Sequence, residues 1–190
     1  MAKSAENKLE MKEILRIGGI LCIICAAVAL ILSFVNMVTA AKIAENEELE
    51  KKSAIVALFG SQTVEYTTME GTPETVNSIY SVTDKGSDLG YCVSVSPGGF
   101  GGDVNLMVGV NSDGSVIGVR VVSHSETPGL GSRIEADSFL SQFVGKSGSV
   151  AEGQDYDIIS GSTVSSDAVA AGVNTALDAL SNMLTGGVTN

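Results

Sequence analysis

The stretch Asp157-Ile158-Ile159-Ser160-Gly161-Ser162-Thr163 stands directly before an apolar helical run and marks where the last helix begins. A helix start presents backbone N–H groups without intrahelical partners, together with the positive end of the helix dipole. Both features favour a phosphate group. The Thr163 hydroxyl at this position can bind a phosphate through a hydrogen bond or carry it covalently. A plain Ser/Thr-rich helix cap without a ligand is the alternative interpretation.

The helix itself is predicted over residues 167–184. Its apolar residues recur every three or four positions and therefore share one face: Val169, Val173, Ala176, Leu177, Leu180 and Leu184. Ser165, Ser166 or Asp167 can cap its start. This face is expected to cover a sheet.

Four segments upstream have the composition of β-strands: residues 76–83, 90–96, 104–111 and 115–123. Ser112-Asp113-Gly114 between the last two is a hairpin signal, and a shorter helical segment is expected near residues 136–143. The predicted fold class is therefore α+β, with a small antiparallel sheet and helices packed against it.

An uncharged, apolar run over residues 17–41 precedes this domain. A helix needs about 20 apolar residues to cross a bilayer, so this run can span one with some tilt. A cleaved signal peptide is the alternative, because Val38-Thr39-Ala40 resembles a cleavage site. The apolar part of a signal peptide is shorter, however, at roughly 7–15 residues. We therefore predict a single retained transmembrane helix.

The charge distribution predicts which side of the membrane the domain occupies. Four basic residues and the α-amino group precede the run, and three basic residues follow closely after it, at Lys42, Lys51 and Lys52. Residues 42–190 as a whole carry seven basic and nineteen acidic residues. The positive-inside rule then places the N-terminus in the cytoplasm and the domain outside. A domain this acidic repels nucleic acid. The predicted organisation is a cytoplasmic flank (1–16), a transmembrane anchor (17–41), a helical stalk (42–60) and an extracytoplasmic domain (61–190).

The three cysteines do not form a disulfide framework. Cys92 stands alone in a predicted strand, and Cys22 and Cys25 lie three residues apart inside the apolar run. That pair can pack as small apolar residues or supply half of an iron–sulfur site shared with another protein chain. Packing is the favoured interpretation, and no residue cluster in the sequence has metal-ligand spacing.

A second loop of interest, Glu126-Thr127-Pro128-Gly129-Leu130-Gly131, follows the last predicted strand. Its glycines allow the backbone to approach a flat ring closely, Pro128 fixes the turn, and Leu130 can pack on the ring face. An ordinary Gly/Pro turn is the alternative. His124 just before it is a possible proton donor, although a structural role is favoured for a lone histidine at a strand end.

Both loops resemble motifs of one family, the FMN-binding subunits of the Rnf and Nqr membrane electron-transport complexes. Residues 157–163 resemble the signature D-x-x-[ST]-G-A-T, with Ser162 in place of the usual alanine. Residues 126–131 are similar to its E-T-P-G-L-G loop, and Phe100-Gly101-Gly102 is also similar. The resemblance covers the anchor and nearly all of the domain, and the short length favours the Rnf form.

This resemblance implies FMN held by a phosphoester bond to Thr163. The implied cofactor-binding residues are Thr163, Ser160, Gly161, Ser162, Glu126, Thr127, Pro128, Gly129, Leu130 and Gly131. Asp157 is implied to serve the flavin transferase that attaches the FMN. The implied function is electron transfer within an ion-translocating ferredoxin:NAD oxidoreductase (Rnf) complex, with the other subunits as partners and without catalysis by this chain alone.

Three alternatives stay open at the level of sequence. The chain can be the FMN subunit of a quinone-reducing, sodium-pumping Nqr complex. It can be a membrane-anchored binding or sensory module without a redox role. It can also be a stand-alone flavin reductase, although such an enzyme usually brings an electron-entry domain, and the sequence has no nicotinamide fingerprint.

Overall fold

The computed structural model describes residues 2–186, and the chain divides into two compact units, residues 1–48 and 49–190. The first unit is the larger part of one long helix, α1 (Ala2–Phe59). Within it, Arg16–Ala40 is the one segment of the described chain that is helical, long and apolar enough to cross a membrane. The side chains of Arg16–Ala40 are all exposed. An apolar helix without protein neighbours is typical of a membrane span, as predicted.

The second unit is built on a five-stranded antiparallel sheet in which each strand pairs with the next in sequence, in the order β1-β2-β3-β4-β5. The strands are β1 (Val64–Thr68), β2 (Ser78–Asp84), β3 (Ser87–Val95), β4 (Val104–Val110) and β5 (Val116–His124). The predictions for β2 to β5 and for the α+β fold class are confirmed. Strand β1 was not predicted, since only Val64 of its five residues is buried.

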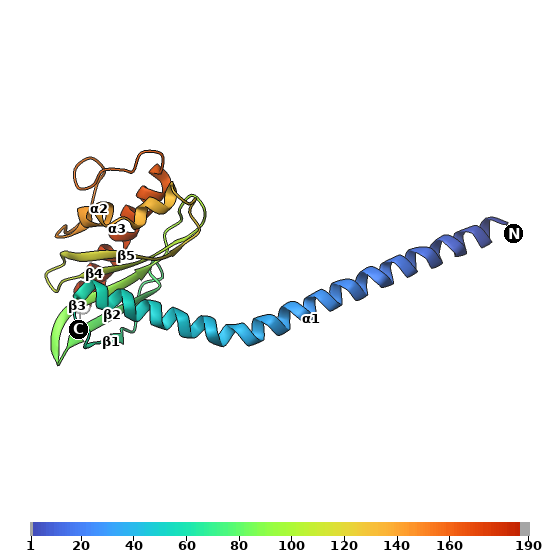
Figure 1. The fold of residues 1–190 in the computed structure, drawn as a ribbon, viewed down its shortest axis with the longest axis horizontal. Helices are drawn as coiled ribbons and strands as arrows, with labels where there is room; N and C mark the ends of the chain where they lie inside the picture. Colours follow the sequence, from blue (N-terminus) through green and yellow to red (C-terminus); the bar gives the residue numbers. More distant parts are fainter. Residues whose placement is uncertain (1, 187–190) are drawn as a thin grey trace. The chain divides into compact units, whose positions relative to one another are not determined.

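One face of the sheet carries the larger hydrophobic core. Helix α3 (Thr163–Gly186) packs over β3 and β4, as the ribbon shows (Figure 1). Val169 and Val173 of the predicted apolar face are fully buried there. Gly172 allows the close approach, because a Cβ atom at this position would lie 2.6 Å from Cδ1 of Leu106 on β4.

The opposite face carries a smaller core that includes the C-terminal end of α1. Ile55 of α1 is fully buried together with Val82, Cys92 and Met107 of the sheet. Because both faces of the sheet are covered, β4 consists almost entirely of apolar residues. Val104 and Leu106 face the larger core, and Met107 faces the smaller one. Both faces of the central strands are therefore held in place.

Short helical turns connect β5 to α3. They are η1 (Gly131–Glu135), α2 (Asp137–Leu140) and η2 (Ser141–Phe143), where a helical segment was predicted over 136–143. Phe143 is fully buried, and its ring meets Phe139 and Tyr156 at centroid distances of 5.5 and 5.3 Å. These contacts fasten the connection between β5 and α3 to the larger core.

The start at residue 167 that the apolar pattern predicted for the last helix is wrong, whereas the helix start placed at Thr163 by the preceding stretch is confirmed. Helix α3 begins four residues earlier, at Thr163. The proposed caps Ser165, Ser166 and Asp167 therefore lie inside the helix. The Ser162 carbonyl accepts the first hydrogen bond, from the Ser166 N–H at 2.9 Å, as an N-cap residue does. Apolar periodicity reports only the packed turns of a helix, so it missed the polar first turn.

Candidate functional site

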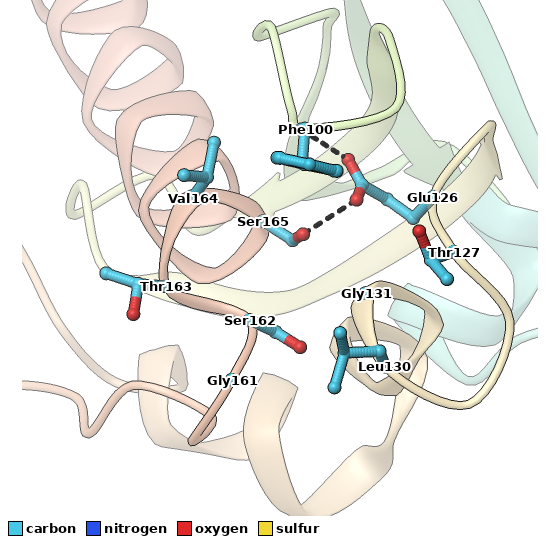
Figure 2. A pocket seen from close by; sticks show the side chains of 10 residues that line it. All are labelled: Phe100, Glu126, Thr127, Leu130, Gly131, Gly161, Ser162, Thr163, Val164 and Ser165. Atoms are coloured by element: carbon cyan, nitrogen blue, oxygen red, sulfur yellow. Dashed lines mark hydrogen bonds between the residues drawn. The ribbon is translucent and has the colours of Figure 1, made fainter.

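Three loops and a helix start enclose a pocket of about 300 Å³ (Figure 2). Phe100 comes from the loop between β3 and β4, and Glu126, Thr127 and Leu130 come from the loop after β5. The remaining lining residues lie in η1 and at the start of α3: Gly131, Gly161, Ser162, Thr163, Val164 and Ser165. The two loops singled out in the sequence, about 30 residues apart in the chain, therefore face one another across one cavity.

Thr163 is the first residue of α3, and its side chain is exposed at the edge of the pocket. The residues that the structure describes give the backbone N–H groups of Thr163, Val164 and Ser165 no backbone or side-chain acceptor. Such a helix start binds anions, because its free N–H groups and the helix dipole point at the same place. The Thr163 hydroxyl thus lies where a phosphate is favoured.

Ser162 has an unusual hydroxyl. Its side chain is buried, and its Oγ atom has no hydrogen-bond partner among the described residues. A buried hydroxyl without a partner costs free energy, which is why such groups are rare away from ligand sites. Figure 2 shows it on the pocket side of the helix start, beside Leu130. The site therefore contains a polar group that the described residues do not satisfy.

Glu126 is a buried carboxylate that ties three segments together. Only 4% of the residue is exposed. Its Oε1 accepts hydrogen bonds from the N–H groups of Phe100 (2.7 Å) and Gly101 (3.2 Å), and its Oε2 accepts one from the Ser165 hydroxyl (2.7 Å). Figure 2 shows the carboxylate bridging Phe100 and Ser165. Glu126 therefore fixes the spacing between the β3–β4 loop, the loop after β5 and helix α3.

These hydrogen bonds also keep Glu126 ionised. Burial raises the pKa of the carboxyl, but the hydrogen bonds from Ser165, Gly101 and Phe100, with the nearby His124, outweigh burial and leave the pKa below its usual value. A carboxylate that accepts several hydrogen bonds is stabilised in its charged form. The pocket wall accordingly carries a fixed negative charge at neutral pH.

Glycines allow the chain to close around this carboxylate. A Cβ atom at Gly131 would lie 2.5 Å from Glu126 Oε2 and 3.0 Å from Ser165 Oγ, and one at Gly99 would meet Glu126 Oε1. Gly129 is different, since it has a φ of +76° and open space around its missing side chain. In this structure Gly131 therefore serves close packing against Glu126, and Gly129 serves a left-handed turn.

His124, weighed as a proton donor, has both ring nitrogens engaged in local contacts. Its Nδ1 accepts a hydrogen bond from the Glu126 N–H at 3.0 Å, and its Nε2 lies 3.0 Å from Glu135 Oε1. His124 is absent from the pocket lining. The ring holds the turn that delivers Glu126, which is the structural role favoured for it.

Seven of the ten predicted site residues line this pocket: Thr163, Gly161, Ser162, Glu126, Thr127, Leu130 and Gly131. Ser160, Pro128 and Gly129 do not line it and are exposed. Asp157 is also exposed outside the pocket, with its backbone N–H bonded to Gln142. The pocket's other lining residues, Phe100, Val164 and Ser165, were not among the predicted site residues. The resemblance of the Phe100-Gly101-Gly102 loop was the available signal for Phe100.

The rim of the pocket is apolar and open. Phe100, Val164 and Leu130 are 74%, 50% and 45% exposed, respectively, although all three line the cavity. Aromatic and aliphatic side chains around a few polar groups are typical of sites for flat organic ligands. Within the described residues, no group of His, Cys, Asp and Glu side chains is placed to hold a metal ion.

Comparisons with known proteins agree with this site. A family model for the FMN-binding domain matches residues 99–178, which include the whole pocket, and a model for the RnfG N-terminal region matches residues 1–58. The chain is 30% identical to the G subunit of the Na(+)-translocating ferredoxin:NAD(+) oxidoreductase complex of Acetobacterium woodii, over 96% of this chain and 99% of that protein. The chain belongs to the RnfG family.

Other members and a solved structure extend this result. The RnfG-family chain is 32% identical to the G subunit of the ion-translocating oxidoreductase complex of Methanosarcina acetivorans, over 90% of this chain and 97% of that protein. Its fold is similar to the crystal structure of the C subunit of the Na(+)-translocating NADH-quinone reductase of Parabacteroides distasonis. That match has a TM-score of 0.57 and 20% sequence identity, and it covers 80% of this chain and 98% of the other.

Proposed function

We propose that this RnfG-family chain is an electron-transfer subunit of an ion-translocating ferredoxin:NAD oxidoreductase complex and carries one FMN on Thr163 through a phosphoester bond. One observation carries the proposal: an exposed threonine hydroxyl stands at a free helix N-terminus, on the edge of a pocket within a matched FMN-binding domain. Relatives that align over nearly the full chain are subunits of such complexes.

The residues present fit FMN. The free N–H groups at the start of α3 suit a phosphate. Phe100, Leu130 and Val164 offer apolar surface for a flat ring, and the partnerless Ser162 hydroxyl can bond to a polar atom of the ligand. When bound, the flavin supplies transfer of one or two electrons. The chain's own residues bind it, orient it and restrict the access of water.

Attachment by a flavin transferase suits the exposure of the signature residues. Asp157, Ser160, Gly161 and Thr163 are exposed, so a second protein can reach them. Ser160 and Asp157, which do not line the pocket, then serve recognition by the transferase. A phosphoester keeps the flavin from being lost by diffusion and leaves its ring free for electron transfer.

The chain is membrane-anchored through Arg16–Ala40, and we infer that its domain lies on the outer face. Four basic residues before the span against three close after it support this orientation by the positive-inside rule. The anchor residues Ile17–Ala40 include no Asp, Glu, Lys, Arg or His, so they supply no charged side chain for an ion path, and ion translocation then falls to other subunits. A reporter enzyme active only outside the cytoplasm, fused after Thr185, tests the orientation. Its inactivity would contradict it.

A Thr163→Ala variant tests the attachment. The full chain is co-expressed with a flavin transferase, denatured, run on a gel and viewed for flavin fluorescence. Thr175→Ala is the matched control, because it removes a threonine hydroxyl, on a half-buried residue, from the same helix away from the pocket. We expect fluorescence from the wild type and Thr175→Ala, and none from Thr163→Ala. Fluorescence in all three would refute Thr163 as the site. Its absence from all three would favour a binding or sensory module.

A further inference from the structure

The carboxylate of Glu126 is a buried charge that has no ion-pair partner among the described residues. Among the described residues, its hydrogen bonds come only from two backbone N–H groups and the Ser165 hydroxyl. The His124 ring accepts a hydrogen bond at Nδ1 and meets Glu135 at Nε2, so it offers Glu126 no proton. Buried charges are usually paired with an opposite charge. Here hydrogen-bond dipoles, with His124 nearby, stabilise the ion, and no ion pair cancels its charge within the described residues.

The charge lies in the wall of the pocket, not behind it. Glu126 lines the pocket. Its carboxylate is held by the Ser165 hydroxyl and the Phe100 N–H group, and both of these residues also line the pocket. Electrostatic interactions are stronger in such a partly enclosed site than in water. Any ligand that gains or loses charge in this pocket therefore does so next to a fixed negative charge.

We propose that Glu126 sets the reduction potential of the bound flavin, and that its charge holds this potential low. This inference rests on the proposed function. Two electrons and one proton added to the oxidised flavin leave one negative charge on the ring. A neighbouring carboxylate opposes that charge and so favours the oxidised form. Glu126 acts here as a positioning and tuning residue and exchanges no electron or proton itself.

Two variants separate this role from a merely structural one. In Glu126→Gln the amide oxygen can still accept from the Phe100 and Gly101 N–H groups, and the amide NH₂ can donate to the Ser165 hydroxyl. The charge is lost while the bridge is kept. In Ser165→Ala the charge is kept but loses the hydrogen bond that disperses it. If Glu126 tunes the flavin, the two substitutions should shift its midpoint potential in opposite directions. If Glu126 is only a structural bridge, both substitutions loosen the site and should shift the potential in the same direction.

The test is a potentiometric titration with dithionite on the full chain, loaded with flavin by co-expression with a transferase and purified in detergent. We expect Glu126→Gln to raise the midpoint potential by at least about 30 mV, which for a two-electron couple corresponds to a tenfold change in the equilibrium between oxidised and reduced flavin. We expect Ser165→Ala to lower it. If Glu126→Gln fails to load, the direction of the Ser165→Ala shift decides.

Shifts of the same sign, or an unchanged potential in either variant, would overturn the inference and leave the proposed function standing. A wild-type chain that carries no flavin after co-expression would instead overturn the proposed function, and this inference with it. Gel fluorescence of each preparation before the titration distinguishes the two failures.

Discussion

Exchanging Gly131 for alanine should destabilise the domain by an amount that can be estimated from the contacts of the added Cβ atom. The added Cβ atom would lie 2.5 Å from Glu126 Oε2, 2.8 Å from Glu126 Cβ and 3.0 Å from Ser165 Oγ. Carbon atoms prefer separations of about 3.5–4.0 Å, so η1 or Glu126 must move by about 1 Å. Overpacking of this kind costs about 1–3 kcal/mol, and weakening a hydrogen bond to a charged group adds about 1–2 kcal/mol. We expect a total loss of about 2–5 kcal/mol.

Gly129→Ala is the matched control two residues away. Its φ is +76°, but nothing lies within 4 Å of the added atom. The cost is then only that of a left-handed alanine, about 1–2 kcal/mol, partly offset by the smaller entropy of the unfolded chain. The structure thus separates two glycines that the sequence placed in one role.

Urea unfolding of the detergent-solubilised full chain measures both variants. Near-ultraviolet circular dichroism is the suitable signal, because all four tyrosines lie in residues 49–190 and the sequence has no tryptophan. With a slope of about 2 kcal/mol per molar urea, in the middle of the usual range, Gly131→Ala should lower the midpoint by about 1–2.5 M. Gly129→Ala should lower it by less. A midpoint for Gly131→Ala equal to the wild type, or higher than that of Gly129→Ala, would refute the packing argument.

Three further predictions follow from other parts of the domain. Phe143→Ala should destabilise the domain by about 3–5 kcal/mol, since it empties a fully buried site between two aromatic rings; a loss below ~1 kcal/mol in urea unfolding would contradict this. The lowered pKa of Glu126 stabilises the fold above the unfolded value of about 4.3, and this stability is lost as the pH falls through the folded pKa. Glu126→Gln should therefore show a weaker decline between neutral and acidic pH, and an identical pH profile would argue against that linkage. Burial raises the pKa of the Cys92 thiol to about 12, so at pH 8 it should react with iodoacetamide only after unfolding. Rapid labelling located on Cys92 in the folded chain, as distinct from the exposed Cys22 and Cys25, would show the site to be open.

The sequence was sufficient for the elements whose apolar pattern is regular. The run over 17–41 and strands β2 to β5 follow from composition and alternation, and each appears where predicted. Strand β1 lacks that pattern, because it lies at the edge of the sheet with one buried residue. The apolar pattern also misses the start of α3, since its first turn carries serines and a threonine and no apolar repeat, and only the stretch before Thr163 indicated it.

The sequence predicted the two loops that form the pocket, but it did not predict how their side chains are arranged in it. The signature around Thr163 and the loop 126–131 pointed to one site, and the structure brings them together. The sequence does not show that Glu126 points inward, because its partners at Phe100, Gly101 and Ser165 are distant in the chain. It likewise does not show the partnerless hydroxyl of Ser162. Such features depend on tertiary contacts, which composition and spacing do not encode.

Mass spectrometry of the peptide that contains Thr163 tests the central proposal most directly. The chain is co-expressed with a flavin transferase, digested and fragmented to locate the modification. We predict a peptide heavier by one FMN less one water, with the added mass on Thr163. An unmodified peptide from a flavin-fluorescent preparation, or the added mass on Ser160 or Ser162, would contradict the account.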